Sequence, residues 1–333
     1  MSLLSVRDLR VGFGRDPRAN EVVKGVSFSL DAGKTLAIVG ESGSGKSVTA
    51  LSVNRLVDFG GGRITGGSIV LERGDGSALE LTTADEATLT HVRGRDVGMI
   101  FQEPMTSLNP VHTVGAQIEE AFRLNRGLTG EAATRAAREA LERVRIPDAA
   151  QRLKYYPHQL SGGMRQRVMI AMVLASNPRL LIADEPTTAL DVTVQAQMLD
   201  LFKTLTEDFG TALVLITHDL GVVAGVADRM MVMYGGRAVE KGTTDDLFYD
   251  PRHPYTLGLL HSTPHIAKRA ERLDPIQGLP PSLEHLPKGC SFNPRCAFAF
   301  DRCLVERPPL APTGNGREKA CHYEGPMTYG KVA

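Results

Sequence analysis

The chain has 333 residues, of which 42% are hydrophobic and 23% are charged, and its formal net charge at pH 7 is zero. This composition is typical of a soluble globular protein of one large domain or two smaller ones. Zero net charge argues against a nucleic-acid partner held by bulk electrostatics. The longest apolar run, residues 168–175, is far shorter than the ~20 residues that span a bilayer, and the first residues alternate like a strand instead of resembling a secretory signal. We therefore expect a cytosolic protein that can still dock on a membrane protein.

Two alternating apolar runs open the chain. Leu9, Val11 and Phe13 form the first run, and residues 26–30 form the second. A polar turn at residues 14–20 separates them, so the pattern predicts two antiparallel strands. Phe13 ends the first predicted strand, where its ring can either stack on a purine or pack as an ordinary core or edge aromatic.

A glycine-rich loop, Gly-Glu-Ser-Gly-Ser-Gly-Lys-Ser, occupies residues 40–47. It follows a predicted buried strand at residues 35–39 and precedes the predicted start of a helix at residues 48–51. This order is the context of a phosphate-binding P-loop, because glycines let successive N–H groups turn toward an anion. The Lys46 ammonium is expected to reach the β- and γ-phosphates, and the Ser47 hydroxyl is expected to bind Mg²⁺. The expected nucleotide-binding residues are Gly40, Ser42, Gly43, Ser44, Gly45, Lys46, Ser47 and Val48.

Glycine clusters follow the P-loop helix. Residues 60–62 and 66–67 are expected to separate that helix from a strand at residues 68–71. Residues 83–91 then predict a short capped helix.

A buried strand is predicted at residues 96–101, and Gln102 follows it directly. The Gln102 amide oxygen suits a metal ion or a water, although a lone glutamine after a strand is by itself typical of polar surface. Residues 114–154 then show helical periodicity, with small and apolar side chains at spacings of three and four. A helical block inserted into an α/β chain predicts a separate helical lobe.

Residues 157–167 carry Ser161, Gly162 and Gly163 ahead of a helix that is expected to run through Val173. A serine hydroxyl and glycine N–H groups at a helix N-terminus can bind an anion, so this loop is a second candidate phosphate site. The same pattern is also that of an ordinary serine N-cap. The spacing alone does not decide between the two.

Two carboxylates end an apolar strand predicted at residues 179–184. Asp184 is expected to hold Mg²⁺, either directly or through water. Glu185 points to the opposite side and suits the polarisation of an attacking water. The apolar residues before the pair argue against an ordinary solvated face.

His218 follows another predicted strand, residues 212–217, after a helix expected at residues 193–208. Ligands bind at the carboxyl ends of strands in open α/β sheets, which places His218 where it can contact a γ-phosphate. Residues 228–242 predict a closing β-hairpin.

Taken together, these motifs resemble the ATP-binding subunits of ABC transporters. The matches are to Walker A at residues 40–47, Walker B at residues 180–185, the family signature at residues 160–166, the Q-loop at Gln102, the D-loop at residues 189–191 and the switch histidine at His218. Phe13 falls where the family has its adenine-stacking aromatic residue. The match extends over roughly residues 4–245, and the joint order of the motifs is highly specific.

The resemblance implies an α/β fold of the P-loop NTPase, ABC type. It implies an antiparallel β subdomain, a helical subdomain and a loop-rich C-terminal extension that contains cysteines. The expected ATPase domain is residues 1–250, with its helical subdomain at about residues 103–178, and the extension is residues 251–333.

The family also implies a head-to-tail dimer that binds ATP and Mg²⁺. ATP at one P-loop is then covered by the signature loop of the partner, through Ser161, Gly162 and Gly163. Hydrolysis is expected to use Glu185 as the base, with His218, Gln102 and the partner's Asp191 completing the site. The implied Mg²⁺ ligands are Ser47, Gln102 and Asp184.

All four cysteines, Cys290, Cys296, Cys303 and Cys321, lie in the last part of the chain. In a cytosolic chain, such clustering favours metal ligation over disulfides. The spacing matches neither the paired CxxC motifs of a zinc ribbon nor a ferredoxin run. Four thiolates can hold a [4Fe-4S] cluster or a tetrahedral zinc ion, or they can remain thiols.

A narrower resemblance is to the oligopeptide/dipeptide/nickel importer branch of the family. Its typical segments here are residues 101–110, 253–256, 278–282, 289–296 and 320–322, with Cys303. In that branch a similar set of tail cysteines is associated with a [4Fe-4S] cluster. The resemblance therefore implies an iron–sulfur cluster with a structural role in this chain.

The two resemblances imply an ATPase that powers import of peptides or a related small solute, at the cytoplasmic face of the bacterial inner membrane. The implied partners are two permease subunits, an extracytoplasmic solute-binding protein and a second ATPase subunit, a paralogue that forms a heterodimer. The alternative is a soluble ABC ATPase acting in DNA repair or on ribosomes. Such proteins usually carry two cassettes, long coiled coils or zinc modules, and the sequence shows none of these; the tail motifs also argue against an exporter.

Overall fold

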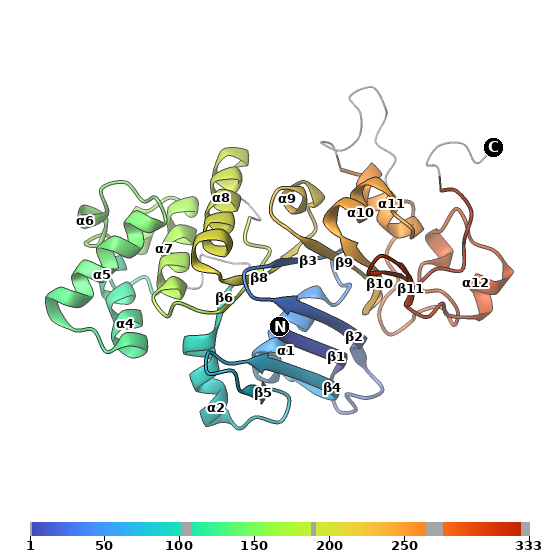
Figure 1. Cartoon of the computed structure of the whole chain (residues 1–333), viewed down its shortest axis with the longest axis horizontal. Helices are drawn as coiled ribbons and strands as arrows, with labels where there is room; N and C mark the ends of the chain where they lie inside the picture. The colour runs from blue at the N-terminus through green and yellow to red at the C-terminus, as the bar shows by residue number, and fades with distance from the viewer. Residues whose placement is uncertain (1, 102–107, 188–190, 264–275, 328–333) are drawn as a thin grey trace. The chain divides into compact units, whose positions relative to one another are not determined.

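The computed structural model describes residues 2–101, 108–187, 191–263 and 276–327 and divides into two compact units (Figure 1). We call residues 84–214 the helical unit, and residues 2–83 with 215–333 the sheet unit. Strand β8 (Ala212–Thr217) crosses the division between them. None of the described helices is both long enough and apolar enough to pass through a bilayer.

The sheet unit contains a four-stranded antiparallel sheet of order β2-β1-β4-β5. Its strands are β1 (Ser2–Phe13), β2 (Glu21–Asp31), β4 (Gly62–Glu72) and β5 (Ala78–Glu80). The predicted pair of N-terminal antiparallel strands is therefore confirmed.

Strand β4 begins earlier than the sequence pattern predicts, because its glycines lie within the strand instead of before it. Gly67 has φ +90° where the register between β1 and β4 shifts. A Cβ atom there would lie 2.5 Å from the Asp8 carbonyl oxygen. Glycine thus permits a bulge in the strand. Gly60 and Gly61 precede the strand as predicted, whereas the prediction that Gly62, Gly66 and Gly67 also lie before it is wrong.

A second group of strands in the sheet unit surrounds the P-loop strand β3 (Thr35–Val39). β3 pairs in parallel with β9 (Arg229–Tyr234), which forms an antiparallel hairpin with β10 (Arg237–Thr243), as predicted. The helices of this unit are α1 (Lys46–Val53), α9 (Leu220–Ala224), α10 (Thr244–Tyr249), α11 (Pro254–His261) and α12 (Asp301–Val305), with 3-10 turns η1 (Leu56–Gly60) and η4 (Asn293–Arg295).

The C-terminal extension joins this sheet, which the sequence did not predict. Strand β12 (Arg317–Lys319) pairs antiparallel with β10, with Glu240 opposite Lys319, and β11 (Ala311–Gly314) pairs with β12 (Figure 1). The extension was expected to be loop-rich, and the two short strands and the helices α11 and α12 are regular elements that the sequence pattern did not predict within it. The physical reason is that β10 has unpaired backbone groups along its other side, and β12 supplies hydrogen-bonding partners for them.

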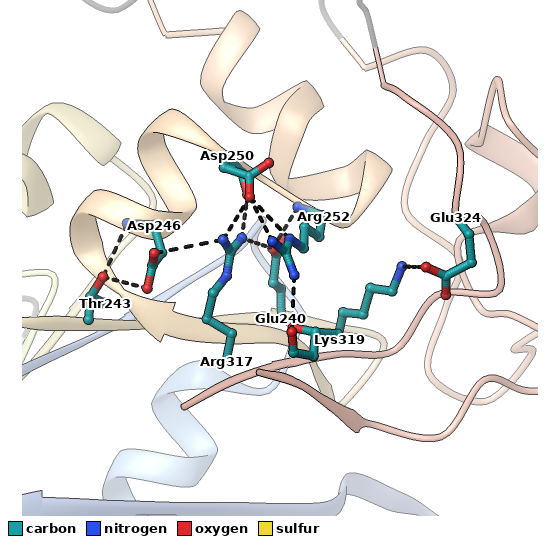
Figure 2. A network of polar contacts seen from close by, with 9 residues as sticks. Glu240, Thr243, Asp246, Asp250, Arg252, Arg317, Lys319 and Glu324 are labelled. Carbon is teal, nitrogen blue, oxygen red and sulfur yellow. Dashed lines mark hydrogen bonds and ion pairs between the residues drawn. The ribbon is translucent and has the colours of Figure 1, made fainter. Parts of the chain in front are cut away.

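A cluster of charged side chains links β12 to β10 and to α10 (Figure 2). Arg317, with its side chain only 6% exposed, donates from Nη1 to Asp250 Oδ2 at 2.8 Å. Its guanidinium also lies 3.7 Å from carboxylate oxygens of Glu240 and of Asp246. The Glu240 carboxylate, 1% exposed, accepts the backbone N–H of Arg252 at 2.7 Å. We call Glu240, Asp246, Asp250 and Arg317 the Arg317 cluster.

The helical unit confirms the predicted helical block. It contains, in chain order, α2 (Glu86–His91), η2 (Val92–Asp96), α4 (Val114–Arg126), α5 (Gly130–Arg143), α6 (Ala149–Arg152), the turn η3 (Pro157–Gln159) and α7 (Gly162–Leu174). Apolar side chains line the buried faces of α4 and α5, including Ile118, Ala137 and Leu141. Two parallel strands, β6 (Val97–Ile100) and β7 (Leu180–Asp184), and helix α8 (Val192–Phe209) complete the unit.

Candidate functional site

The glycine-rich loop lies between β3 and α1, as the sequence predicts. Gly40 and Gly45 have φ values of +151° and +97°, and Gly45 caps the N-terminus of α1. A Cβ atom on Gly40 would lie 2.3 Å from the Met233 carbonyl oxygen of β9. Only glycine fits this close approach, which lets the loop curl beside the neighbouring strand.

Lys46, the first residue of α1, is buried and directs its ammonium back over the loop. Its Nζ donates to the carbonyl oxygens of Gly40 at 2.7 Å and of Glu41 at 3.0 Å. The positive charge is thus held where the loop N–H groups and the N-terminus of α1 also favour an anion. Ser47 follows within the first turn of the same helix.

A pocket opens beside this loop in the sheet unit. Phe13, at the end of β1, lines it together with residues 41–44 of the loop and residues 279–284 of the C-terminal extension. Within the described residues, the buried hydroxyl of Ser44 has no hydrogen-bond partner. The pocket therefore combines an aromatic side chain, a loop of the phosphate-binding type and a hydroxyl without a hydrogen-bond partner. This set of groups suits the binding of a purine nucleotide.

Glu41 links the loop to the C-terminal extension. Its carboxylate accepts two hydrogen bonds from the Arg295 guanidinium, at 2.6 and 2.9 Å, and these bonds raise the pKa of Arg295. Its backbone N–H donates to the Tyr255 hydroxyl at 2.7 Å. Burial raises the pKa of Tyr255. Neither Arg295 nor Glu41 is predicted from the sequence as a site residue.

The carboxylate pair ends β7 in the helical unit. Asp184 is buried, and Glu185 follows with φ +47°, in the left-handed region that side chains other than glycine rarely adopt. Such strain at the end of a strand is typical of functional positions. The sequence gives no signal for this conformation.

The signature residues begin α7 in the helical unit. Ser161 is the N-cap, and its hydroxyl accepts the Met164 N–H at 3.3 Å. Ser161 and Gly162 are exposed. An exposed serine hydroxyl and exposed N–H groups at a helix N-terminus suit an anion. Beyond its own chain neighbours and helix backbone, nothing lies within 4 Å of a Cβ built on Gly162. Asp191 is likewise an N-cap, for α8, and accepts the Val194 N–H at 2.9 Å.

The remaining predicted site residues lie in different parts of the chain, and some fall outside the described residues. His218 directly follows β8 and is exposed, in the sheet unit. Gln102 and residues 189–190 lie outside the described residues. Phe13 and residues 42–44 are brought together at one pocket, whereas Asp184, Glu185, Ser161 and Asp191 belong to the other unit.

The four cysteines of the extension line one small cavity, together with Phe292, His253 and His322. None of the four forms a disulfide. Burial, with a smaller contribution from the neighbouring thiols, raises the pKa of Cys296 to about 12 and of Cys321 to about 11. Within the described part of the chain, no three His, Cys, Asp or Glu side chains are arranged to hold a metal ion.

His253 forms one side of that cavity as a neutral imidazole. It is fully buried, and burial, followed by the charge of Lys319, lowers its pKa to about 3. Its Nδ1 accepts the Tyr255 N–H at 3.0 Å, which caps α11. A neutral imidazole is needed for that cap, because a protonated ring has no acceptor nitrogen.

Comparison with known proteins identifies the family. Residues 23–188 match the family described as ABC transporter, and residues 239–303 match the oligopeptide/dipeptide transporter C-terminal region. The chain belongs to the ABC transporter family. The resemblance predicted from the motifs is therefore confirmed, and the chain is an ABC-type ATP-binding subunit.

The relatives of this ATP-binding subunit match it over nearly its whole length. The oligopeptide transport ATP-binding protein AppD of Bacillus subtilis (strain 168) is 51% identical, with 96% of each chain covered. A putative peptide import ATP-binding protein of Brucella melitensis is 50% identical, also with 96% of each chain covered. The dipeptide transport ATP-binding protein DppD of Escherichia coli (strain K12) is 47% identical, with 97% of each covered.

Solved structures confirm the fold of the subunit. The dimeric ATP-binding cassette MJ0796, in a post-hydrolysis state bound to ADP and Pi, is similar with a TM-score of 0.63 and 27% identity. That match covers 72% of this subunit and 98% of the cassette. The cbiO1 subunit of Clostridium perfringens, part of the transporter complex cbiONQ, also gives a TM-score of 0.63, at 25% identity and with 75% and 91% covered.

Proposed function

We propose that this subunit binds and hydrolyses ATP to drive the import of peptides by an ABC transporter. The observation that carries the proposal is the pocket beside the P-loop, lined by Phe13, the loop and the C-terminal extension. The last of these belongs to the region that matches oligopeptide/dipeptide transporters. The names of the relatives, which refer to peptide, oligopeptide and dipeptide transport, support the choice of peptides as the solute.

The chemical roles follow from the residue types and their local geometry. The loop N–H groups and the buried Lys46 ammonium bind the phosphates, and Phe13 stacks on the adenine. Ser47, Gln102 and Asp184 are the proposed Mg²⁺ ligands, because hard oxygen donors suit that ion, which neutralises phosphate charge when bound. Glu185 accepts a proton from the attacking water, and His218 contacts the γ-phosphate.

A second ATPase subunit completes each site in this proposal. One subunit holds the ATP, and its partner covers it with Ser161, Gly162 and Gly163. Asp191 of the partner subunit completes the same site. The exposed N-terminus of α7 supports this role, because its hydroxyl and N–H groups suit a phosphate from another chain. We propose a paralogue as the second subunit, two permease subunits and an extracytoplasmic solute-binding protein as further partners, and the cytoplasmic face of the bacterial inner membrane as the location.

The assembled transporter tests this function. Co-expression with permease and ATPase subunits of a peptide importer should yield a stable complex. In proteoliposomes that also contain the binding protein, ATP should then drive peptide uptake. Lys46→Ala removes the phosphate-binding ammonium. We expect this variant to abolish uptake while the subunits of the complex remain associated. Co-purification with nucleic acid or ribosomes, and none with permeases, would instead support the soluble ATPase alternative.

We further propose that the cysteine cavity holds a [4Fe-4S] cluster with a structural role. The support is the donor set: four thiols, from the buried Cys303 and the half-buried Cys290, Cys296 and Cys321, line one cavity. Each cysteine sulfur ligates a different iron of such a cluster, so the four ligand sulfurs stand farther apart than those around a lone zinc ion.

Anaerobically purified protein should be brown and contain about four iron and four sulfide ions per chain. Removal of the iron by a chelator should lower the melting temperature of the extension, because a structural cluster stabilises the fold that supplies its ligands. Cys303→Ser should lose the colour, whereas Ser291→Ala, beside Cys290, should keep it. A colourless protein with one zinc ion per chain would contradict the proposal.

A further inference from the structure

The second residue of the P-loop, Glu41, is held from two sides by residues outside the ATPase motifs. Its carboxylate forms a paired, fork-like contact with the Arg295 guanidinium, at 2.6 Å and 2.9 Å. The Arg295 side chain is 4% exposed and that of Glu41 is 28% exposed. Charge-assisted bidentate pairs of this kind fix orientation as well as distance.

The same short segment of the extension also supports the loop through an aromatic cluster. Phe292 packs against Tyr234 and Tyr255, with ring centroids 5.2 Å and 5.3 Å apart. Tyr255 is fully buried, and its hydroxyl accepts the Glu41 N–H at 2.7 Å. Both the backbone and the side chain of Glu41 are therefore positioned by groups that contact the segment between Cys290 and Cys296.

Arg295 also holds the pocket wall that the extension supplies. Its Nε donates to the Gln277 carbonyl at 3.0 Å, directly before the lining residues 279–284. Farther along the wall, Lys24 Nζ of β2 donates to the Leu283 carbonyl at 3.0 Å. One guanidinium thus contacts both the P-loop and the segment that leads into residues 279–284 of the pocket lining.

We propose that Arg295 is a positioning residue of the nucleotide site, and that the C-terminal extension is thereby part of that site. The effect passes through Glu41 to Lys46, because the Lys46 ammonium is held by the carbonyl oxygens of Gly40 and Glu41. Without the ion pair, these carbonyls and the ammonium lose their fixed placement before the nucleotide binds. The inference rests on the proposed ATP-binding function of the loop.

The test uses the full chain and the binding of Mg²⁺ with a fluorescent ATP analogue. Arg295→Met keeps most of the side-chain volume but removes the ion pair, and we expect a Kd about tenfold higher, equivalent to ~1.4 kcal/mol. In steady-state hydrolysis, KM for ATP should rise by a similar factor, while kcat should change less than about threefold, since a loss of uniform binding raises KM alone.

A double-mutant cycle separates positioning from general damage to the fold. Glu41→Gln alone should weaken nucleotide binding about as much as Arg295→Met, and the double variant should be no weaker than either, because one interaction is lost in all three. Arg302→Met is the matched control. Arg302 forms a similar bidentate pair with Glu306 in the same extension, but both side chains are exposed and neither contacts the P-loop.

Wild-type affinity in Arg295→Met, additive losses in the double variant or an equal loss in Arg302→Met would each overturn the inference. Should Arg295→Met fail to fold, Glu41→Gln decides alone, because it leaves the extension unchanged. A wild-type chain that binds no ATP analogue would instead refute the proposed function itself, so the two failures are distinguishable.

Discussion

Replacement of Glu185 by glutamine is expected to lower kcat for ATP hydrolysis by about 10²- to 10⁴-fold, the usual effect of losing a general base. The amide has the shape of the carboxylate but cannot accept a proton from water. ATP binding should stay within about twofold of wild type, because the P-loop that supplies the phosphate contacts is unchanged. The quantities to measure are single-turnover hydrolysis and ATP affinity, for the assembled transporter.

The slow variant should also accumulate a closed, ATP-bound pair of ATPase subunits, which size-exclusion chromatography with Mg²⁺ and ATP can detect. Glu142→Gln is a suitable control, because Glu142 lies exposed on α5 and forms only a surface ion pair with Arg138. Unchanged turnover in Glu185→Gln would remove Glu185 as the base. The left-handed backbone at this position should be unaffected, since glutamate and glutamine have the same backbone preferences.

Arg317→Met is expected to lower the free energy of unfolding by about 3–5 kcal/mol, the range for breaking one partner of a buried ion pair. Arg317 and Glu240 are both almost fully buried, so the variant leaves the Glu240 carboxylate without its cation (Figure 2). Urea unfolding followed by circular dichroism measures the effect. The matched control is Arg252→Met, which breaks a more exposed pair with Asp250 and should change stability by less than about 1 kcal/mol.

The loss of stability in Arg317→Met should depend on pH in one direction. Burial raises the pKa of Glu240, and Arg317 acts in the opposite direction. Without Arg317 the pKa rises further, and protonation then removes the uncompensated charge. The stability gap between Arg317→Met and wild type should therefore narrow as the pH falls, and Glu240→Gln added to the variant should recover part of the loss at neutral pH. A gap that widens in acid would contradict this explanation.

Much of the fold was predictable because its signals are local. The strand, glycine loop and helix around residues 40–47 follow one another directly, and the structure has them as β3, the loop and α1. The helix expected at residues 193–208 is observed as α8 (Val192–Phe209), with Asp191 as its N-cap. Periodicity and capping chemistry act over a few residues, so a single sequence displays them.

The missed parts of the site depend on contacts between distant residues. Glu41 and Arg295 are 254 positions apart, and nothing in either local pattern points to the other. In the sequence, each of these two residues resembles an ordinary charged side chain on the surface. Only the fold brings them together. The left-handed backbone conformation of Glu185 could not be predicted either. The surroundings of a residue impose such a conformation, and the residue type does not reveal it.

The pairing of β12 with β10 also bears on how the chain is made. A protein emerges from the ribosome from its N-terminus, and residues 237–243 of β10 are synthesised long before residues 317–319 of β12. During that interval β10 has an open edge, and Glu240 lacks the arginine that lies beside it in the finished fold. Nascent chains with open strand edges are prone to pair with one another. β10 therefore gains its partner strand only after the C-terminal extension has been synthesised.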